Sequence, residues 1–212
     1  MRLVFIGPPG VGKGTQAKRL QEITGSNVFS TGDILRDAMA NGTPLGLEAK
    51  RFVESGELVP DEVVNGLIRE TLAPLESGFI LDGYPRTVAQ GRFLESLLTE
   101  LERPLDAVIE FVLDEETLVR RLSGRRTCSQ CGAIFHIEAS PSAKGDLCDK
   151  CGGSLTIRKD DEPETIRKRL IVYRDQTAPL VGFYKERGAH RAVSAEASPD
   201  QVFASLKETL GL

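Results

Sequence analysis

Tryptophan is absent from this 212-residue chain, and histidine and methionine occur only twice each. No apolar run approaches the 18 or more residues that a membrane span needs, and no internal repeat or low-complexity tract is present. The apolar start at residues 1–7 has no cleavage site, so it favours a first strand over a signal peptide. We therefore expect a cytoplasmic protein with no membrane partner. Because no coiled-coil pattern occurs, we also expect a monomer.

The composition is that of a globular protein, with 40% hydrophobic and 27% charged residues, which excludes disordered and fibrous classes. At about 150 residues per domain, the length fits one domain with insertions, or two domains at most. The net charge of -4 argues against nucleic acid as a general partner. Arginine nevertheless outnumbers lysine by 18 to 9 and gathers within residues 120–126 and 158–169. Such local clusters suit a small polyanion, although solvated helix faces are the alternative interpretation.

The continuous apolar run at residues 3–6 predicts a strand that is buried on both faces, and residues 79–82 and 108–114 predict a second and a third buried strand. Residues 27–30 and 191–194 are shorter strand candidates. Helical patterns at residues 15–20, 163–180 and 199–210 lie between or after these runs. Alternating strands and helices predict an α/β fold with a parallel sheet flanked by helices.

Two segments interrupt this alternation, and we interpret both as insertions into one α/β core. Residues 33–40, 45–55 and 61–72 predict three helices without a strand, the first two ended by Gly42 and Gly56. Residues 124–161 hold all four cysteines and two short β-like runs, at residues 134–137 and 155–157.

A glycine-rich loop follows the first predicted strand. Residues 7–15 contain the pattern G-x-x-x-x-G-K, although Gly14 stands between Lys13 and Thr15, where the strict pattern has Ser or Thr directly after Lys. Glycines allow successive backbone N–H groups to turn toward phosphate oxygens, and the following helix adds its positive end. Lys13 would contact the β- and γ-phosphates. A flexible turn without a ligand is the alternative, but it leaves the strand–Lys–helix context unexplained.

The cysteines form two C-x-x-C pairs, Cys128/Cys131 and Cys148/Cys151, each followed by glycine. Two such pairs, separated by 16 residues, are typical of a tetrahedral zinc site. Four thiolates leave no open coordination position, so we expect the metal to be structural. Disulfides are the alternative, which a reducing cytoplasm disfavours. Neither histidine, His136 or His190, is needed as a ligand.

Seven segments together resemble adenylate kinases, in the family's order and over nearly the whole chain: residues 7–16, 30–36, 78–87, 124–126, 160–161, 167–169 and 177–180. The cysteines make the chain similar to the zinc-containing, long-lid bacterial members. The resemblance implies a P-loop core at residues 1–29, 60–123 and 162–212, an AMP-binding insertion at 30–59 and a zinc-bound lid at 124–161. It also implies Mg²⁺-dependent phosphoryl transfer from ATP to AMP, giving two ADP.

The resemblance further implies the roles of individual residues. The catalytic cations would be Lys13, Arg86, Arg125, Arg158 and Arg169. ATP would be bound by Gly10, Val11, Gly12, Lys13, Gly14, Thr15, Arg121, Arg125, Ile134, Phe135 and Ala197. AMP would be bound by Thr31, Arg36, Glu57, Leu58, Val59, Gly83, Tyr84, Pro85, Arg86, Gln90, Arg158 and Arg169. Mg²⁺ would be held through water by Asp82. For Asp33 two roles stay open: a place near this Mg²⁺ site, or the N-cap of the next helix.

Several of these assignments fit elementary chemistry. The acceptor phosphate is already an anion near neutral pH, so catalysis needs positioning and charge stabilisation rather than a general base. Arginine suits this task because its planar fork binds phosphate oxygens bidentately. The amide of Gln90 can donate and accept at once, as the polar edge of adenine requires. His136 could line the ATP pocket.

The chain departs from the family pattern at Tyr84, where Phe is frequent, and at Ala197, where Lys or Gln is frequent. A kinase for another acceptor, such as UMP or CMP, is the nearest alternative, against which Thr31 and Gln90 favour adenine. A zinc-ribbon module that binds nucleic acid is the alternative from another class, and the acidic charge balance disfavours it.

Overall fold

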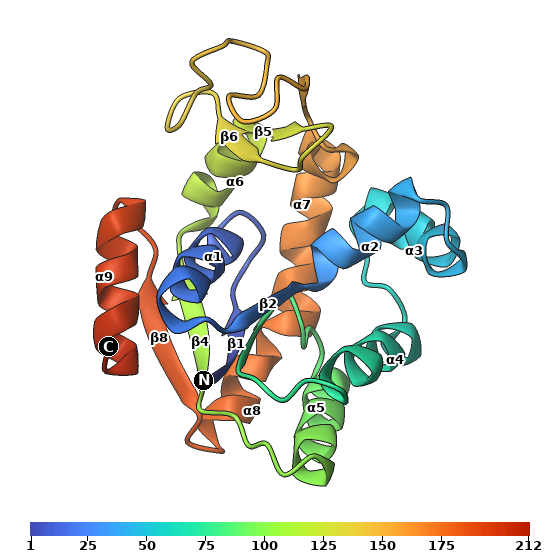
Figure 1. Ribbon diagram of the computed structural model, residues 1–212, viewed down its shortest axis with the longest axis vertical. Helices are drawn as coiled ribbons and strands as arrows, with labels where there is room; N and C mark the ends of the chain where they lie inside the picture. The colour runs from blue at the N-terminus through green and yellow to red at the C-terminus, as the bar shows by residue number, and fades with distance from the viewer.

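The computed structural model describes residues 1–212, and its centre is a five-stranded parallel sheet (Figure 1). The strand order is β2 (Asn27–Ser30), β3 (Phe79–Asp82), β1 (Arg2–Ile6), β4 (Ala107–Val112) and β8 (His190–Ser194). Every neighbouring pair is parallel, so the carboxyl ends of the strands share one edge. Ligands of open α/β sheets bind outside that edge.

Both faces of the sheet are buried, as the apolar runs predict. Along β1, Val4 and Ile6 pack on one face, while Leu3 and Phe5 pack on the other. The first face is covered by α4 (Asp61–Leu72), α5 (Val88–Glu100) and α8 (Pro179–Lys185). The second is covered by α1 (Lys13–Thr24), α6 (Glu115–Ser123), α7 (Pro163–Val172) and α9 (Pro199–Leu210). The predicted α/β class with a parallel sheet between helices is therefore confirmed.

Two predicted boundaries change at helix starts. Helix α1 begins at Lys13, two residues before the predicted start, and runs on to Thr24. The strand predicted at 108–114 ends at Val112, because the Asp114 carboxylate accepts a 2.8 Å hydrogen bond from the Thr117 N–H and caps α6.

The helical stretch predicted over residues 163–180 is confirmed, but it is not one uniform α-helix. Helix α7 ends at Val172, and a π-helical turn, η2 (Tyr173–Thr177), separates it from α8, which continues to Lys185. The Ala178 N–H donates to the Tyr173 carbonyl, five residues back, at 2.8 Å. Pro179 has no N–H and its ring would clash with a carbonyl of an uninterrupted α-helix, so the wider turn just before it accommodates the ring.

Helices α2 (Thr31–Ala40) and α3 (Pro44–Ser55) form a separate pair beside the sheet (Figure 1, right). Ser30 is the N-cap of α2, since its hydroxyl accepts a hydrogen bond from the Asp33 N–H at 3.3 Å. An N-cap role for Asp33 is therefore wrong. The two helices touch at Gly46, where an added Cβ would lie 2.1 Å from the Ala38 carbonyl oxygen.

This contact yields a stability prediction. We expect Gly46→Ala to lower the free energy of unfolding by about 2 kcal/mol, because the new methyl group meets backbone that cannot yield locally. Gly66→Ala is the matched control, since it adds a methyl inside α4 where no atom lies within 4 Å. It should raise stability by roughly 0.5–1 kcal/mol. Urea unfolding curves of both variants test the pair, and equal effects would contradict the packing argument.

The cysteine-bearing segment forms its own small sheet at the top of Figure 1. It consists of β5 (Arg125–Cys128), β6 (Ile134–His136) and β7 (Leu155–Thr156), in the antiparallel order β6-β5-β7. The short 3₁₀ turn η1 (Lys159–Asp161) leads from this sheet into α7. Strand β5 was not predicted, because its start is dominated by arginines rather than apolar residues.

No helix is long and apolar enough to cross a membrane. The predicted domain boundaries stay a prediction.

Candidate active site

The glycine-rich loop connects β1 to α1 at the carboxyl edge of the sheet. Gly10 and Gly12 have positive φ angles of 84° and 106°, which glycine adopts without strain. A Cβ at Gly10 would also lie 2.7 Å from Cγ of Leu122 in α6. Gly12 is the N-cap of α1 and supplies no side-chain cap. The positive end of α1 therefore faces the loop without a capping oxygen, which suits an anionic ligand.

Lys13 points back over this loop. Its Nζ donates hydrogen bonds to the carbonyl oxygens of Gly7 and Pro8, at 2.7 and 3.1 Å. Burial, opposed by Asp82 and assisted by nearby arginines including Arg86, lowers the pKa of Lys13 to about 8. A bound phosphate would favour the charged ammonium, so the site is prepared for a polyanion.

Asp82 lies at the end of β3, close to the start of α1. An added Cβ at Gly14 would lie 3.1 Å from its Oδ2. Burial raises the pKa of Asp82, although the Lys13 ammonium opposes this shift. A carboxylate oxygen is a hard ligand, and it lies beside the phosphate loop. It therefore has the chemistry needed to hold a hydrated Mg²⁺.

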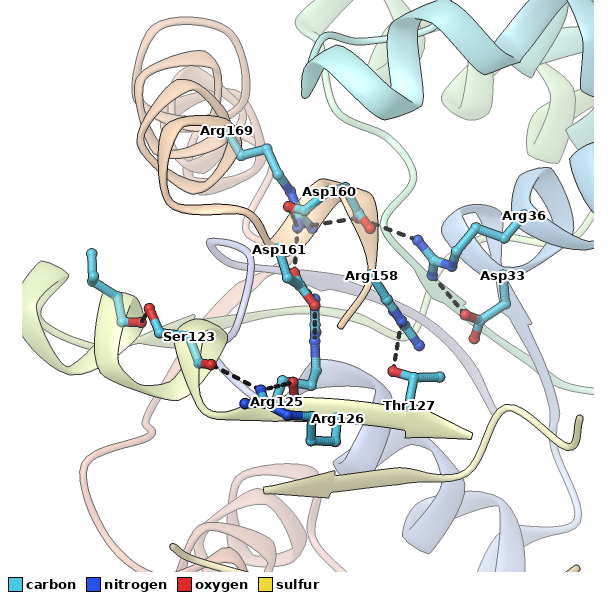
Figure 2. A network of polar contacts seen from close by, with 11 residues as sticks. Asp33, Arg36, Ser123, Arg125, Arg126, Thr127, Arg158, Asp160, Asp161 and Arg169 are labelled. Atoms are coloured by element: carbon cyan, nitrogen blue, oxygen red, sulfur yellow. Dashed lines mark hydrogen bonds and ion pairs between the residues drawn. The ribbon is translucent and has the colours of Figure 1, made fainter. Parts of the chain in front are cut away.

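A network of arginines and aspartates lies between the small sheet, α2 and α7 (Figure 2). Arg125 from β5 donates to both carboxylate oxygens of Asp161, at 2.7 and 2.5 Å. Arg169 from α7 lies 3.0 Å from Asp161 and 3.1 Å from Asp160. Arg36 from α2 lies 3.6 Å from Asp160. Three elements far apart in the sequence thus share two aspartates whose side chains are 0% and 8% exposed.

Positive charge exceeds negative charge in this network. Burial alone would raise the pKa of Asp160, but the guanidinium groups of Arg169 and Arg36 outweigh it and lower that pKa. Arg158 adds a further cation, whose Nε donates to the Thr127 hydroxyl at 2.9 Å. Burial and the neighbouring Arg36 lower the pKa of Arg158 to about 10, so it stays charged at neutral pH.

Arg86 completes the cationic set from the loop after β3. Its Nε donates to the Gly83 carbonyl at 2.7 Å, and burial together with Arg169 lowers its pKa to about 10. The structure thus gathers all the cations that the sequence predicts for phosphate binding: Lys13, Arg36, Arg86, Arg125, Arg158 and Arg169. Arg120 and Arg126 are not part of this cationic set. The Arg120 side chain donates to the Thr117 hydroxyl, and the Arg126 side chain donates to the carbonyl oxygens of Ser123 and Arg125.

Asp160 and Asp161 enter the sequence-based prediction only through the family resemblance, without a role. We expect Asp161→Asn to lower the free energy of unfolding by roughly 3 kcal/mol, because it leaves the largely buried Arg125 without its counter-charge. The control is Glu100→Gln, which breaks an exposed pair with Arg69 and should cost under about 1 kcal/mol. Thermal unfolding without nucleotide measures both, and equal costs would contradict the buried-network interpretation.

The residues predicted for AMP differ in how they are placed. The Thr31 hydroxyl donates to the Gly83 carbonyl at 2.8 Å. Gln90 is 1% exposed and is held by hydrogen bonds within the protein, so it is not a surface glutamine. The Tyr84 ring is fully buried and its hydroxyl donates to Asn65, which leaves only its backbone for a ligand. Val59 and Pro85 are buried, Leu58 is half-buried, and Glu57 is paired with Lys168 at 2.6 Å.

On the other side of the phosphate loop, a cavity of about 270 Å³ lies between α6, the small sheet and the loop after β8. Arg121 lines it and donates to the Ala195 carbonyl at 2.9 Å and the Val11 carbonyl at 3.4 Å. Glu196 also lines it and precedes the exposed Ala197. Ile134 and Phe135 lie on β6, directly before His136, which lines the same cavity.

The sequence left both histidines unassigned. The His136 Nδ1 accepts hydrogen bonds from the N–H groups of Glu138 and Ala139, at 3.1 and 3.0 Å. Its Nε2 is buried without a partner and packs against Gly124, where an added Cβ would lie 2.3 Å from it. His190 is placed differently, 2.7 Å from the Glu110 carboxylate on the neighbouring strand.

The four cysteines are brought together, and all are free thiols. The sulfurs lie within 4.8 Å of one another, with 3.4 Å from Cys128 to Cys151 and 3.6 Å from Cys131 to Cys148. Tetrahedral Zn–S bonds of about 2.3 Å place sulfurs about 3.8 Å apart, close to this spacing. Hydrogen bonds from the backbone N–H groups of Cys131 and Gln130 lower the pKa of the Cys128 thiol to about 6. The cluster can therefore hold a metal ion.

Comparisons with known proteins agree with this geometry. Residues 5–189 match the family model described as adenylate kinase. Among curated proteins, the adenylate kinase of Thermodesulfovibrio yellowstonii is 52% identical over 208 residues, covering 97% of each chain. That of Archaeoglobus fulgidus is 52% identical over 190 residues, covering 89% of this chain and 88% of its own. The adenylate kinase of Bacillus pumilus is 49% identical over 213 residues, which cover 100% of this chain and 98% of the relative. The chain belongs to the adenylate kinase family.

Proposed function

We propose that this phosphotransferase moves the γ-phosphoryl group of ATP to AMP, reversibly and with Mg²⁺, giving two ADP. The observation that carries the proposal is the gathering of six cations, Lys13 and five arginines, beside the phosphate loop, against four aspartates: Asp33, Asp82, Asp160 and Asp161. This excess of cations is suited to two nucleotides whose phosphates meet end to end.

The chemistry follows from the charges. AMP brings a phosphate that is already anionic, so no side chain has to remove a proton before attack. The protein holds the two phosphate chains in line and stabilises the negative charge on the transferred group. Bidentate guanidinium groups on different elements are suited to this, because each grips oxygens in a fixed plane.

Two metals have separate proposed roles. Mg²⁺ would be held through water near Asp82, where it would neutralise phosphate charge. Zn²⁺ would be held by Cys128, Cys131, Cys148 and Cys151, whose sulfur spacing supports a saturated tetrahedral site. With four thiolate ligands the zinc has no open position, so it would stabilise the lid rather than take part in the reaction.

The two insertions would serve to exclude water. Residues 30–59 would close over AMP and residues 124–161 over ATP, which prevents transfer of the phosphoryl group to water. One ion pair supports this proposal, because it joins the two insertions: Glu54 of α3 lies 3.1 Å from Lys159 of η1. Glu57, just after α3, pairs with Lys168 of α7 at 2.6 Å. We further propose that the chain works in the cytoplasm as a monomer.

An acceptor panel tests the proposed reaction. Purified protein is mixed with ATP and MgCl₂, and AMP, UMP, CMP and GMP are offered in turn while diphosphate products are separated by chromatography. We expect AMP to be the preferred acceptor, with two ADP formed for each AMP consumed. Preference for UMP or CMP would overturn the acceptor assignment and support the pyrimidine alternative, while no transfer to any acceptor would overturn the proposal.

A nucleic-acid-binding zinc module is not favoured, because the family match and the complete phosphate site leave it unsupported. The net charge of -4 also opposes binding to a polyanionic backbone. A salt titration of binding to labelled DNA and RNA checks this, and we expect no binding at physiological salt.

A further inference from the structure

The amide of Gln90 is held by two groups from different parts of the chain. Its Nε2 donates to Asp61 Oδ1 at 2.7 Å, and its Oε1 accepts from the Arg86 N–H at 2.7 Å. Asp61 lies in the first turn of α4, 29 residues before Gln90. Its other oxygen, Oδ2, accepts from the Thr87 hydroxyl at 2.9 Å. The carboxylate is thereby fixed toward Gln90.

We infer that Asp61 is a positioning residue that fixes the orientation of the Gln90 amide and so sets which base the acceptor nucleotide carries. This inference rests on the proposed function, in which Gln90 binds the AMP base. A carboxylate can only accept hydrogen bonds, and a backbone N–H can only donate. If the amide turned over, its oxygen would face Asp61 and its NH₂ would face the Arg86 N–H, so both contacts would be lost.

The valences that remain on Gln90 match adenine. An amide has two N–H donors and two acceptor lone pairs, and the protein uses one of each. One N–H donor and one oxygen lone pair of the Gln90 amide are left for the base, and their relative positions are fixed. Adenine offers an amino donor beside a ring-nitrogen acceptor, whereas guanine offers a carbonyl acceptor beside an N–H donor. The order is reversed, so a fixed amide serves adenine, while an amide that could turn over would serve both bases.

A purely structural role for Asp61 is the rival explanation. The negative carboxylate of Asp61 stabilises α4 by lying at its positive, N-terminal end. Its hydrogen-bond partner Thr87 is the N-cap of α5. In that case its loss would lower stability and affect all acceptors alike. The inference instead predicts a change in the ratio between acceptors, which a structural role would not move.

The experiment compares Asp61→Asn with wild type. Asparagine has nearly the same shape but can present either an oxygen or an NH₂ group to Gln90. We measure kcat/KM for AMP and for GMP, the KM for ATP, and the melting temperature. We expect the AMP-to-GMP ratio of kcat/KM to fall about tenfold, with the KM for ATP unchanged, because one charge-assisted hydrogen bond no longer fixes the amide.

Glu62→Gln is the matched control, since it removes a carboxylate from the same first turn, and Glu62 is exposed. Its ratio should equal that of wild type. If Asp61→Asn is unfolded at the assay temperature, Asp61→Ser gives the second measurement, with the same expected fall. A ratio that stays unchanged in a folded variant would overturn the positioning role. A wild-type enzyme without preference for AMP would instead overturn the proposed function, so the two failures can be told apart.

Discussion

Lys13→Met is expected to lower kcat by at least about 10²-fold, the scale of losing one preorganised donor to a charged transition state. The protein should still fold, because the Lys13 side chain donates only to carbonyl oxygens of its own loop. In the free protein its ammonium is buried among arginines and its pKa is lowered to about 8. Methionine removes that charge, so the variant should melt at the same temperature as wild type or higher.

The pH dependence of stability follows from the same pKa. Between about 8 and 10.5 the unfolded chain holds a proton on Lys13 that the folded chain has released, so wild-type stability gains with rising pH. Below about 8 both states are charged, and burial of the ammonium destabilises the folded state. The stability advantage of Lys13→Met should therefore be present at pH 7 and diminish as the pH rises through this window.

Urea unfolding at several pH values measures this difference, alongside turnover at pH 7.5. Lys18→Met is the matched control, because Lys18 is exposed on the same helix. It should keep most of the activity and show no such pH-dependent difference. Near-normal turnover of a folded Lys13→Met variant would remove Lys13 from the site.

The second large effect concerns the cysteine cluster. A Cys128→Ser, Cys131→Ser double variant should lose its metal and melt at a lower temperature. The lid has few buried apolar residues, so metal binding should supply much of its folding free energy. Structural zinc sites contribute roughly 10–16 kcal/mol in isolated peptides. If metal binding adds about 4 kcal/mol to the free energy of unfolding of the whole protein, its loss lowers the melting temperature by about 8–16 °C.

Elemental analysis and calorimetry of wild type and variant measure the two parts of this prediction. Ser129→Ala, between the two cysteines, is the control and should retain one zinc per chain. The double variant should keep measurable phosphoryl transfer at low temperature, since the proposed zinc would be saturated by four thiolates. Wild-type protein without metal would contradict the zinc assignment. Loss of all activity in a variant that is still folded would contradict a purely structural role.

Local patterns account for what was predicted well. A continuous apolar run such as residues 3–6 is typical of a strand covered on both faces in an α/β protein. The loop before Lys13 and the C-x-x-C pairs are equally local, because their chemistry depends on residues a few positions apart. Their positions in the fold could therefore be read from the sequence.

Contacts between distant segments could not be predicted in the same way. Nothing near Asp61 in the sequence indicates that its carboxylate meets Gln90, and Asp61 resembles an ordinary acidic residue at a helix start. The sharing of Asp160 between Arg36 and Arg169 likewise depends on how α2 and α7 are placed. The sequence left Asp33 open between the Mg²⁺ neighbourhood and the N-cap of α2, and the structure gives the cap to Ser30.

We propose that one site, between the phosphate loop and the arginine network, holds both nucleotides with their phosphates end to end. Titration calorimetry with a two-headed mimic, in which two adenosines are joined by a phosphate chain, tests it most directly. We expect one mimic bound per chain, displacement of both ATP and AMP, and binding weakened in Lys13→Met. Two mimics bound per chain, or displacement of only one of the two nucleotides, would contradict it.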